Sequence, residues 1–166
     1  MKYIHSAIVT LFMLTAYVLT AFAATAVEQP ADCIQCGMNR TTFSHSRTLL
    51  EYQDGKKNGT CSINCAIVDQ KKNNGKKLKS LKVADYTTKK LIDATTAAWV
   101  IGGDIDGVMT PVPKWAFAHK NGAQVFVKDH GGWLAPYKEV YQAVSEELEM
   151  REKDKGQGHQ GHQHKH

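Results

Sequence analysis

Four cysteines in two closely spaced pairs constrain this chain more than any other feature of its sequence. Cys33 and Cys36 form a C-x-x-C motif, and Cys61 and Cys65 form a C-x-x-x-C motif. Such pairs can form structural disulfides in an oxidising compartment, can bind a metal ion or can act as a redox-active dithiol. The spacing alone leaves these three possibilities open.

Residues 1–26 are predicted to be a signal peptide. Lys2 precedes an apolar run at 7–23, and the small residues of 21–26 fit the pattern that signal peptidase cleaves. The alternative is an uncleaved membrane anchor, because the run is nearly long enough to cross a bilayer. No cysteine follows the run closely, so a lipid anchor is not indicated. We expect export to the periplasm or cell envelope, with membrane contact only if the signal stays uncleaved.

A thiol–disulfide oxidoreductase is the least favoured of the three possibilities. In thioredoxin-like proteins, the C-x-x-C motif follows a strand and opens a helix, whose N-terminus lowers the pKa of the first thiol. Here the motif lies only a few residues into the mature chain, so a preceding strand has no room. Gly37, directly after Cys36, is also a poor residue with which to open a helix.

The metal possibility divides between zinc and copper. Four thiolates would complete a tetrahedral Zn(II) site. Met38 favours Cu(I), because a thioether is a poor ligand for zinc and a good one for the soft Cu(I) ion. The glycine between Cys36 and Met38 allows both side chains to turn toward one ion. The alternative role for Met38 is packing in the core.

Other residues are weaker candidates for metal ligands. Met109 lies in a loop bounded by Gly107 and Pro111, where a methionine that only fills core space is unexpected. His130 is a further candidate, whereas His45 and His119 are expected to be surface or core residues. The tail adds four histidines that can bind Cu(II), Ni(II) or Zn(II) without a preformed cavity, or that only keep the tail soluble: His159, His162, His164 and His166.

Composition and motifs exclude several classes of function. The formal net charge of +5 is only mildly basic and does not indicate nucleic-acid binding. The lysine-rich stretch 71–82 is interpreted as a solvated loop. The sequence has no G-x-S-x-G elbow, no phosphate-binding glycine loop and no H-E-x-x-H motif. We therefore expect neither an enzyme nor a small-molecule substrate.

The pattern of apolar and turn-forming residues predicts a small α+β domain. Residues 27–32 form a polar linker, residues 33–150 the domain and residues 151–166 a disordered His-rich tail. The expected elements are a strand at 46–53, a hairpin turn at Asp54-Gly55, a return strand through 59–61, a helix at 63–72 capped by Ser62, a strand at 78–86, one or two strands in 91–101, a buried segment at 115–118 and a helix at 136–150. Periodicity does not decide whether 122–130 is a strand or a helix.

Several short motifs, in their order and spacing, resemble the NosL family of copper-binding accessory proteins for nitrous oxide reductase assembly. They spread over residues 33–140: Cys36-Gly37-Met38, Leu91-Ile92-Asp93-Ala94, Ala97-Ala98-Trp99-Val100-Ile101-Gly102-Gly103, Met109 followed by Pro111-Val112-Pro113, Ala116-Phe117-Ala118, and Asp129-His130-Gly131-Gly132.

The resemblance implies an α+β fold similar to that of organomercurial lyase, with a helix at 122–130. It also implies Cu(I) binding in the periplasm, with Cys36, Met38 and Met109 as ligand candidates. Members of the family are commonly lipoproteins, and this chain lacks a lipidation cysteine. Its other three cysteines are additional to the family's Cys-x-Met pattern. They can widen the site, form a disulfide or mark a subgroup that serves another copper enzyme.

Together these features predict a metallochaperone that captures Cu(I) and delivers it to a cuproenzyme such as nitrous oxide reductase, or to the machinery that matures that enzyme. The alternative is an adaptor that binds other proteins and is held together by a Zn(II)–thiolate site or by disulfides.

Overall fold

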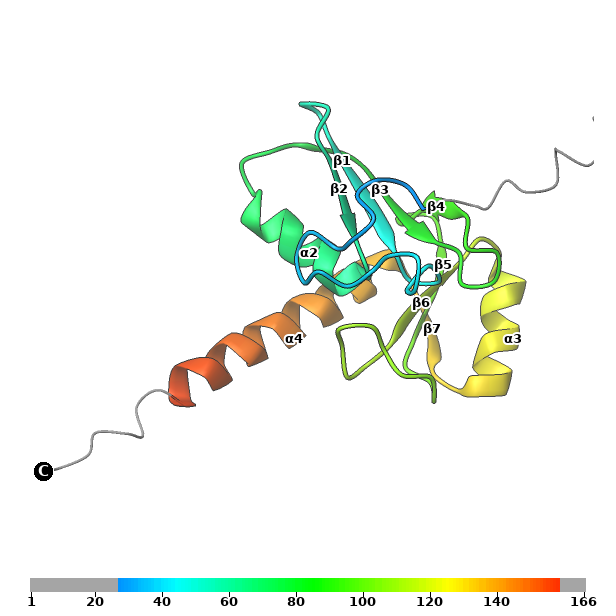
Figure 1. Cartoon of the computed structure of the whole chain (residues 1–166). Helices are drawn as coiled ribbons and strands as arrows, with labels where there is room; N and C mark the ends of the chain where they lie inside the picture. Colours follow the sequence, from blue (N-terminus) through cyan, green and yellow to red (C-terminus); the bar gives the residue numbers. More distant parts are fainter. Residues whose placement is uncertain (1–26, 159–166) are drawn as a thin grey trace, which may run out of the picture.

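Two small antiparallel sheets form the framework of the protein (Figure 1). The computed structural model describes residues 27–158, so the predicted signal peptide and the tail histidines lie outside the described residues. The elements follow one another as β1 (Thr48–Tyr52), β2 (Lys57–Thr60), α2 (Ile63–Lys72), β3 (Leu78–Ala84), β4 (Leu91–Asp93), β5 (Ala98–Ile101), β6 (Lys114–Phe117), α3 (Lys120–His130), β7 (Trp133–Ala135) and α4 (Tyr137–Gly158). The predicted α+β class is confirmed.

The first sheet has the strand order β2-β1-β3-β4 and begins with the predicted hairpin. β1 pairs with β2 across the Asp54-Gly55 turn, where the amide of Tyr52 donates to the carbonyl of Lys56 at 2.9 Å. Leu50 and Leu81 are opposite one another on the face that packs against α2, because alternate residues of a strand point to the same side. This face contributes Leu50, Tyr52, Leu81 and Val83 to the larger hydrophobic core, which also includes residues of α2, the second sheet and α4.

Helix α2 has the bounds that the sequence predicted. Ser62 is its N-cap residue and has an extended backbone, but its side chain makes no capping hydrogen bond. Lys71 and Lys72 lie in the last turn, where positive charge is favourable against the helix dipole. The helix packs on β1 and β2 and against α4.

The second sheet has the order β6-β5-β7, and α3 covers one side of it. Residues 120–130 form a helix, as the family resemblance implied and the periodicity left undecided. Ala123 and Phe126, three residues apart, both enter the core, and the Phe126 ring lies 5.4 Å from that of Phe117 on β6. Gly132 then crosses β5 so closely that a Cβ atom would lie 2.6 Å from the carbonyl oxygen of Ile101. This close crossing requires glycine where the chain enters β7.

Helix α4 is longer than predicted. Residues 151–158 were expected to be disordered, but they continue the helix, whose last turns project from the body (Figure 1). Gly156 is the first helix-breaking residue after Pro136, and Glu149 and Lys153 have the spacing of a favourable pair on a helix. The Arg151 guanidinium also donates to the carbonyl of Met109 at 3.2 Å. No helix in residues 27–158 is long and apolar enough to span a membrane.

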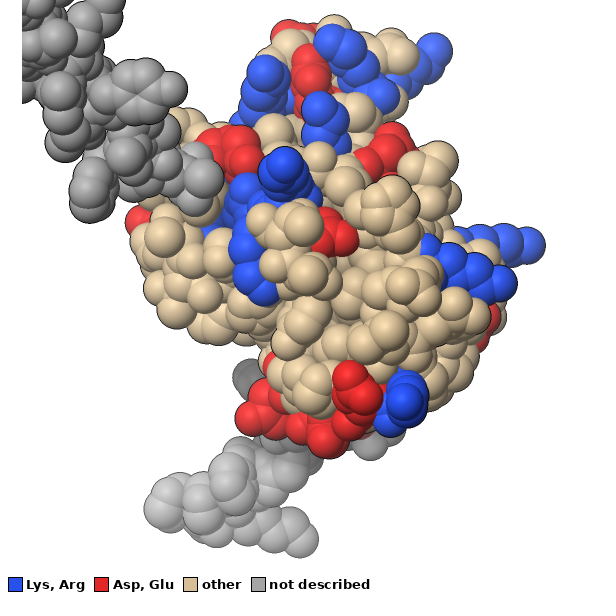
Figure 2. Space-filling view, turned by 90° about the vertical axis from the view of Figure 1, so that its right-hand side faces the viewer, with Lys and Arg blue, Asp and Glu red and all other residues tan. Residues whose placement is uncertain are grey.

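The lysine-rich stretch 71–82 lies at the end of the first sheet, near the hairpin. Lys76 pairs with Asp54 at 2.6 Å and Lys79 pairs with Glu51 at 2.7 Å. Figure 2 shows the blue Lys and Arg side chains at the top of the molecule interspersed with red acidic ones. The predicted solvated loop is wrong for most of the stretch, because Lys71 and Lys72 end α2 and Lys79 and Lys82 belong to β3, and only residues 73–77 form a connection. The lysines are nevertheless exposed to solvent, as the prediction required.

The buried side chain of Arg40 fastens the segment that precedes the domain to the first sheet. Its guanidinium donates to the carbonyls of Thr48 at 2.9 Å and Thr60 at 3.2 Å, and also to those of Glu28 and Pro30. Arg47 adds an ion pair with Glu28 at 2.8 Å. The predicted linker 27–32 is therefore held against the domain.

Replacing Gly59 with alanine should weaken the fold through Arg40. The new Cβ atom would lie 2.6 Å from two guanidinium atoms, so Arg40 would have to leave some of its four carbonyl acceptors. We expect the free energy of unfolding to fall by about 1–3 kcal/mol, as overpacking of a core typically causes. Denaturant unfolding of the metal-free protein measures this change. Gly75→Ala is the control because its Cβ meets nothing within 4 Å, and equal stability of the two variants would contradict the prediction.

Candidate metal centre

All four cysteines converge on one point of the structure. Their sulfur atoms lie within 4.8 Å of one another. Cys36 Sγ is 3.5 Å from Cys61 Sγ, and Cys65 Sγ is 3.8 Å from each of these two. Four sulfurs bound to one tetrahedral ion, with metal–sulfur bonds of about 2.3 Å, are about 3.8 Å apart. The cluster thus has the size of a four-sulfur metal site, and all four cysteines are free thiols.

A tight turn presents Cys33 and Cys36. The amide of Cys33 donates to the carbonyl of Met38, and the amide of Gly37 donates to the carbonyl of Cys33, both at 2.8 Å. Gly37 has a φ of 75°, a left-handed conformation that glycine adopts without steric cost. The C-x-x-C motif lies on this loop and opens no helix, as the sequence predicted.

The start of α2 presents the other two thiols. Cys61 precedes the N-cap residue Ser62, and Cys65 is the third residue of the helix. Amide groups at a helix N-terminus are unpaired within the helix and favour negative charge nearby. This position suits thiolates, the form in which cysteine binds a metal.

Exposure differs among the four thiols. Cys33, Cys61 and Cys65 are buried in an apolar cluster that includes Trp115, whereas Cys36 is half-buried. The accessible side of the site is therefore the side of Cys36.

The thiols also influence one another's ionisation. Hydrogen bonds from Cys61 and Cys65 to the Cys33 sulfur lower the pKa of Cys33. The same bonds raise the pKa values of Cys61 and Cys65, and burial raises both further. In the metal-free protein, Cys61 and Cys65 therefore keep their protons, which a metal cation must displace.

The two methionine candidates have different environments. Met38 is half-buried and packs against the apolar cluster that contains Cys33, Cys61 and Cys65. Met109 is 39% exposed, although its neighbour Val108 is buried in that cluster. Both remain predicted ligands, and Met38 is the less exposed of the two.

The histidines do not join the thiol group within residues 27–158. His130 Nδ1 lies 3.0 Å from Asp104 Oδ1, and its ring lies 4.7 Å from that of Phe126. His45 is half-buried, with its ring 5.6 Å from that of Trp115, and burial lowers its pKa. His119 is the exposed N-cap of α3. The four tail histidines lie outside the described residues.

The sequence analysis missed a buried polar network around Asp69, on α2. Its carboxylate accepts hydrogen bonds from Tyr52 Oη at 2.7 Å and from Gln35 Nε2 at 2.9 Å. Gln35 lies between the two cysteines of the C-x-x-C motif. Asp69 follows Cys65 by four residues, and this spacing was the signal available in the sequence. It could not identify the side chains that donate to the Asp69 carboxylate.

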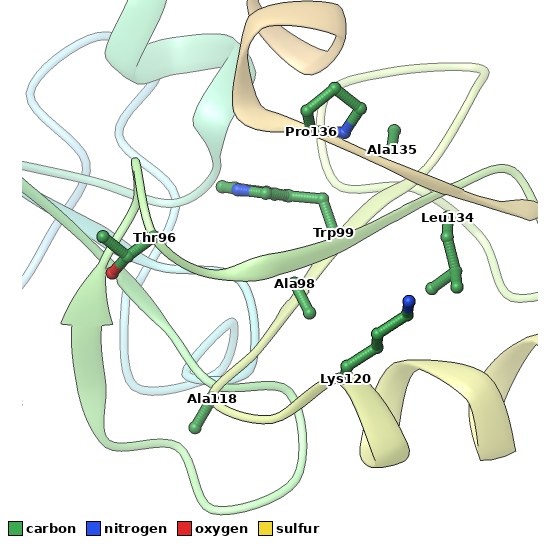
Figure 3. Close-up of a pocket in the computed structure, with 8 residues that line it drawn as sticks. All are labelled: Thr96, Ala98, Trp99, Ala118, Lys120, Leu134, Ala135 and Pro136. Carbon is green, nitrogen blue, oxygen red and sulfur yellow. The ribbon is translucent and has the colours of Figure 1, made fainter.

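A separate cavity of about 390 Å³ lies between β5, β7 and the start of α3. Figure 3 shows Lys120 reaching from α3 toward Leu134, with the Trp99 indole ring nearby. None of the four cysteines lines this cavity. It is therefore not part of the thiol cluster.

Comparisons with known proteins identify a family and a similar fold. A family model described as NosL matches residues 24–145. The fold is similar to that in the crystal structure of the copper chaperone NosL from Shewanella denitrificans, with a TM-score of 0.57 and 22% sequence identity over 71% of this chain and 95% of that one. A search of curated proteins gave no significant match.

The burial of the thiols predicts the order in which they react. In the reduced, metal-free protein, iodoacetamide should modify Cys36 roughly tenfold faster than Cys33, Cys61 or Cys65, because only Cys36 is accessible. Timed quenching followed by peptide mass spectrometry measures the four rates. Protein unfolded in guanidinium is the control, in which the rates should be similar. A rate at Cys61 equal to that at Cys36 in the folded protein would contradict this placement.

Proposed function

The chain belongs to the NosL family, and from that membership we propose that it binds Cu(I) outside the cytoplasm and transfers it to a copper enzyme. The single observation that carries the proposal is the convergence of four free thiols from two separate segments. A NosL protein of similar fold is called a copper chaperone. Both points also support a binding protein rather than an enzyme.

Cu(I) suits the site better than other cations because the donors are soft. Thiolate and thioether sulfur prefer Cu(I), and Met38 packs against the apolar cluster that contains Cys33, Cys61 and Cys65, so we propose that its thioether joins them as a ligand. Three buried thiols in an apolar surrounding limit the access of water and oxidants to the ion. Zn(II) is the alternative, since four thiolates also satisfy its tetrahedral preference.

Transfer requires that an acceptor can replace the ligands one at a time. The half-buried Cys36 is the ligand that an acceptor reaches first, while Cys33, Cys61 and Cys65 still hold the ion. The acceptor is a cuproenzyme such as nitrous oxide reductase, or a protein of its maturation machinery. Export through the N-terminal signal peptide places the protein in the periplasm or cell envelope, where such an acceptor would meet it.

Titration with Cu(I) tests the proposal directly. Reduced protein should take about one Cu(I) from a competing chromophoric chelator under anaerobic conditions. Cys61→Ser should lower the affinity by about 100-fold or more, which corresponds to about 2.7 kcal/mol, and Met38→Leu by roughly tenfold. Met150→Leu is the matched control because Met150 is an exposed residue of α4. Failure to compete for Cu(I), together with Zn(II) binding that ignores Met38, would favour the adaptor alternative.

The affinity for Cu(I) should also depend on pH. Metal binding displaces protons from the thiols, and the pKa values of Cys61 and Cys65 are raised. The affinity should therefore fall by about tenfold or more for each unit of pH from 8 to 6. The same competition assay, repeated with the chelator calibrated at each pH, measures the slope. An affinity independent of pH would indicate binding by thioethers and contradict the thiolate site.

A further inference from the structure

Gln35 joins the two halves of the thiol cluster. It lies on the loop between Cys33 and Cys36, and its side chain bonds to two residues of α2, the helix that begins beside Cys61 and carries Cys65. Its Nε2 donates to Asp69 Oδ1 at 2.9 Å, and its Oε1 accepts from Lys72 Nζ at 2.7 Å. One side chain thus connects the C-x-x-C loop to the C-x-x-x-C segment.

The carboxylate that receives Gln35 is itself fixed. Asp69 is 1% exposed, and Tyr52 Oη and Asn58 Nδ2 donate to its Oδ2 at 2.7 and 2.9 Å. These donors belong to β1 and β2, so the first sheet determines the position of the carboxylate. Asp69 follows Cys65 by four residues, about one helical turn, and therefore lies on the same face of α2. The helix therefore holds the Asp69 carboxylate and the Cys65 thiol in fixed positions relative to each other.

A backbone hydrogen bond attaches the other end of the loop. The amide of Ile34 donates to the carbonyl of Gly59 at 3.1 Å, which holds the Cys33 end of the loop on β2. Cys36, at the other end, is half-buried and followed by Gly37, whose φ is positive. The contact between Gln35 and Asp69 is therefore placed to hold the more accessible end of the loop against α2.

We propose that Gln35 is a positioning residue of the thiol site, which holds Cys36 near Cys61 and Cys65 and so controls how fast a bound metal leaves. This inference rests on the proposed function and adds to it the control of release. With the anchor in place, the Cys36 and Cys61 sulfurs remain 3.5 Å apart. Without it, the Cys36 end can separate from α2, and the ion loses one of its four sulfurs.

Removing the Gln35 side chain should leave the fold intact. Asp69 would keep its hydrogen bonds from Tyr52, Asn58 and Asn73, so no buried carboxylate is left without donors. The change therefore acts on the loop rather than on the core. Mutation of a residue that orients a metal ligand in this way typically lowers metal affinity by about 10–100-fold.

The first test measures metal release. The reduced protein is loaded with Cu(I), and transfer to an excess of a competing chelator is followed by stopped flow. Gln35→Ala should release Cu(I) about tenfold faster than the unmodified protein. Gln35→Glu keeps the size and the partner Lys72, but it places a carboxylate against Asp69, so it should release Cu(I) at least as fast. Gln124→Ala, an exposed glutamine of α3, is the matched control and should leave the rate unchanged.

Two further readouts separate positioning from stability and from copper binding. In the Co(II)-substituted protein, Gln35→Ala should change the absorption bands of the tetrathiolate ion, whereas a merely structural role would alter only the unfolding transition. In the metal-free protein, the same variant should raise the iodoacetamide reaction rate of Cys65 by roughly tenfold as the loop separates from α2.

These outcomes distinguish the two proposals. If the unmodified protein holds no Cu(I) but Gln35→Ala still exposes Cys65, the copper function fails and the positioning role stands. If Cu(I) binds tightly while the release rate and the Cys65 reactivity of Gln35→Ala equal those of Gln124→Ala, the positioning role is overturned and the copper function remains.

Discussion

The rest of the structure depends on the buried guanidinium of Arg40. It binds carbonyl groups of the N-terminal segment and of both hairpin strands, including that of Thr60, directly before Cys61. An unpaired buried charge is costly, so Arg40 and its acceptors must come together as the chain folds. In doing so they bring the loop that carries Cys33 and Cys36 to the start of α2. One interaction thus assembles the site.

The site that results has a buried part and an accessible part. Cys33, Cys61 and Cys65 belong to the apolar cluster, whereas Cys36 is half-buried at its edge. Cys36 and Met38 are also the two residues of the predicted Cys-x-Met motif. The other three cysteines, Cys33, Cys61 and Cys65, lie deeper in the core than this pair. In the proposed carrier, this arrangement would hold a metal with three buried thiols and leave one ligand exposed to an acceptor.

Local patterns in the sequence predicted most of the elements. The hairpin at Asp54-Gly55 and the helix at 63–72 formed as expected because turn chemistry and residue spacing act over a few neighbours. Two regions need the tertiary structure to explain them. Periodicity left residues 122–130 open between strand and helix, and they form the helix that the family resemblance implied because Ala123 and Phe126 pack in the core. The last helix extends to Gly158, past the predicted end at Met150, because no helix breaker intervenes before Gly156 and Arg151 binds the loop at Met109.

The sequence by itself determined which atoms are available for chemistry: four thiols in two pairs and a thioether beside one of them. It could not determine whether the pairs meet, since residue spacing carries no information about distances between segments that are 25 residues apart or more. Only the tertiary structure decided that point, by placing all four sulfurs within 4.8 Å and by leaving Cys36 as the accessible one. It also revealed Arg40, Asp69 and Gln35, whose roles arise from partners distant in the chain. Buried polar groups need hydrogen-bond partners, and the fold alone specifies which partners they receive.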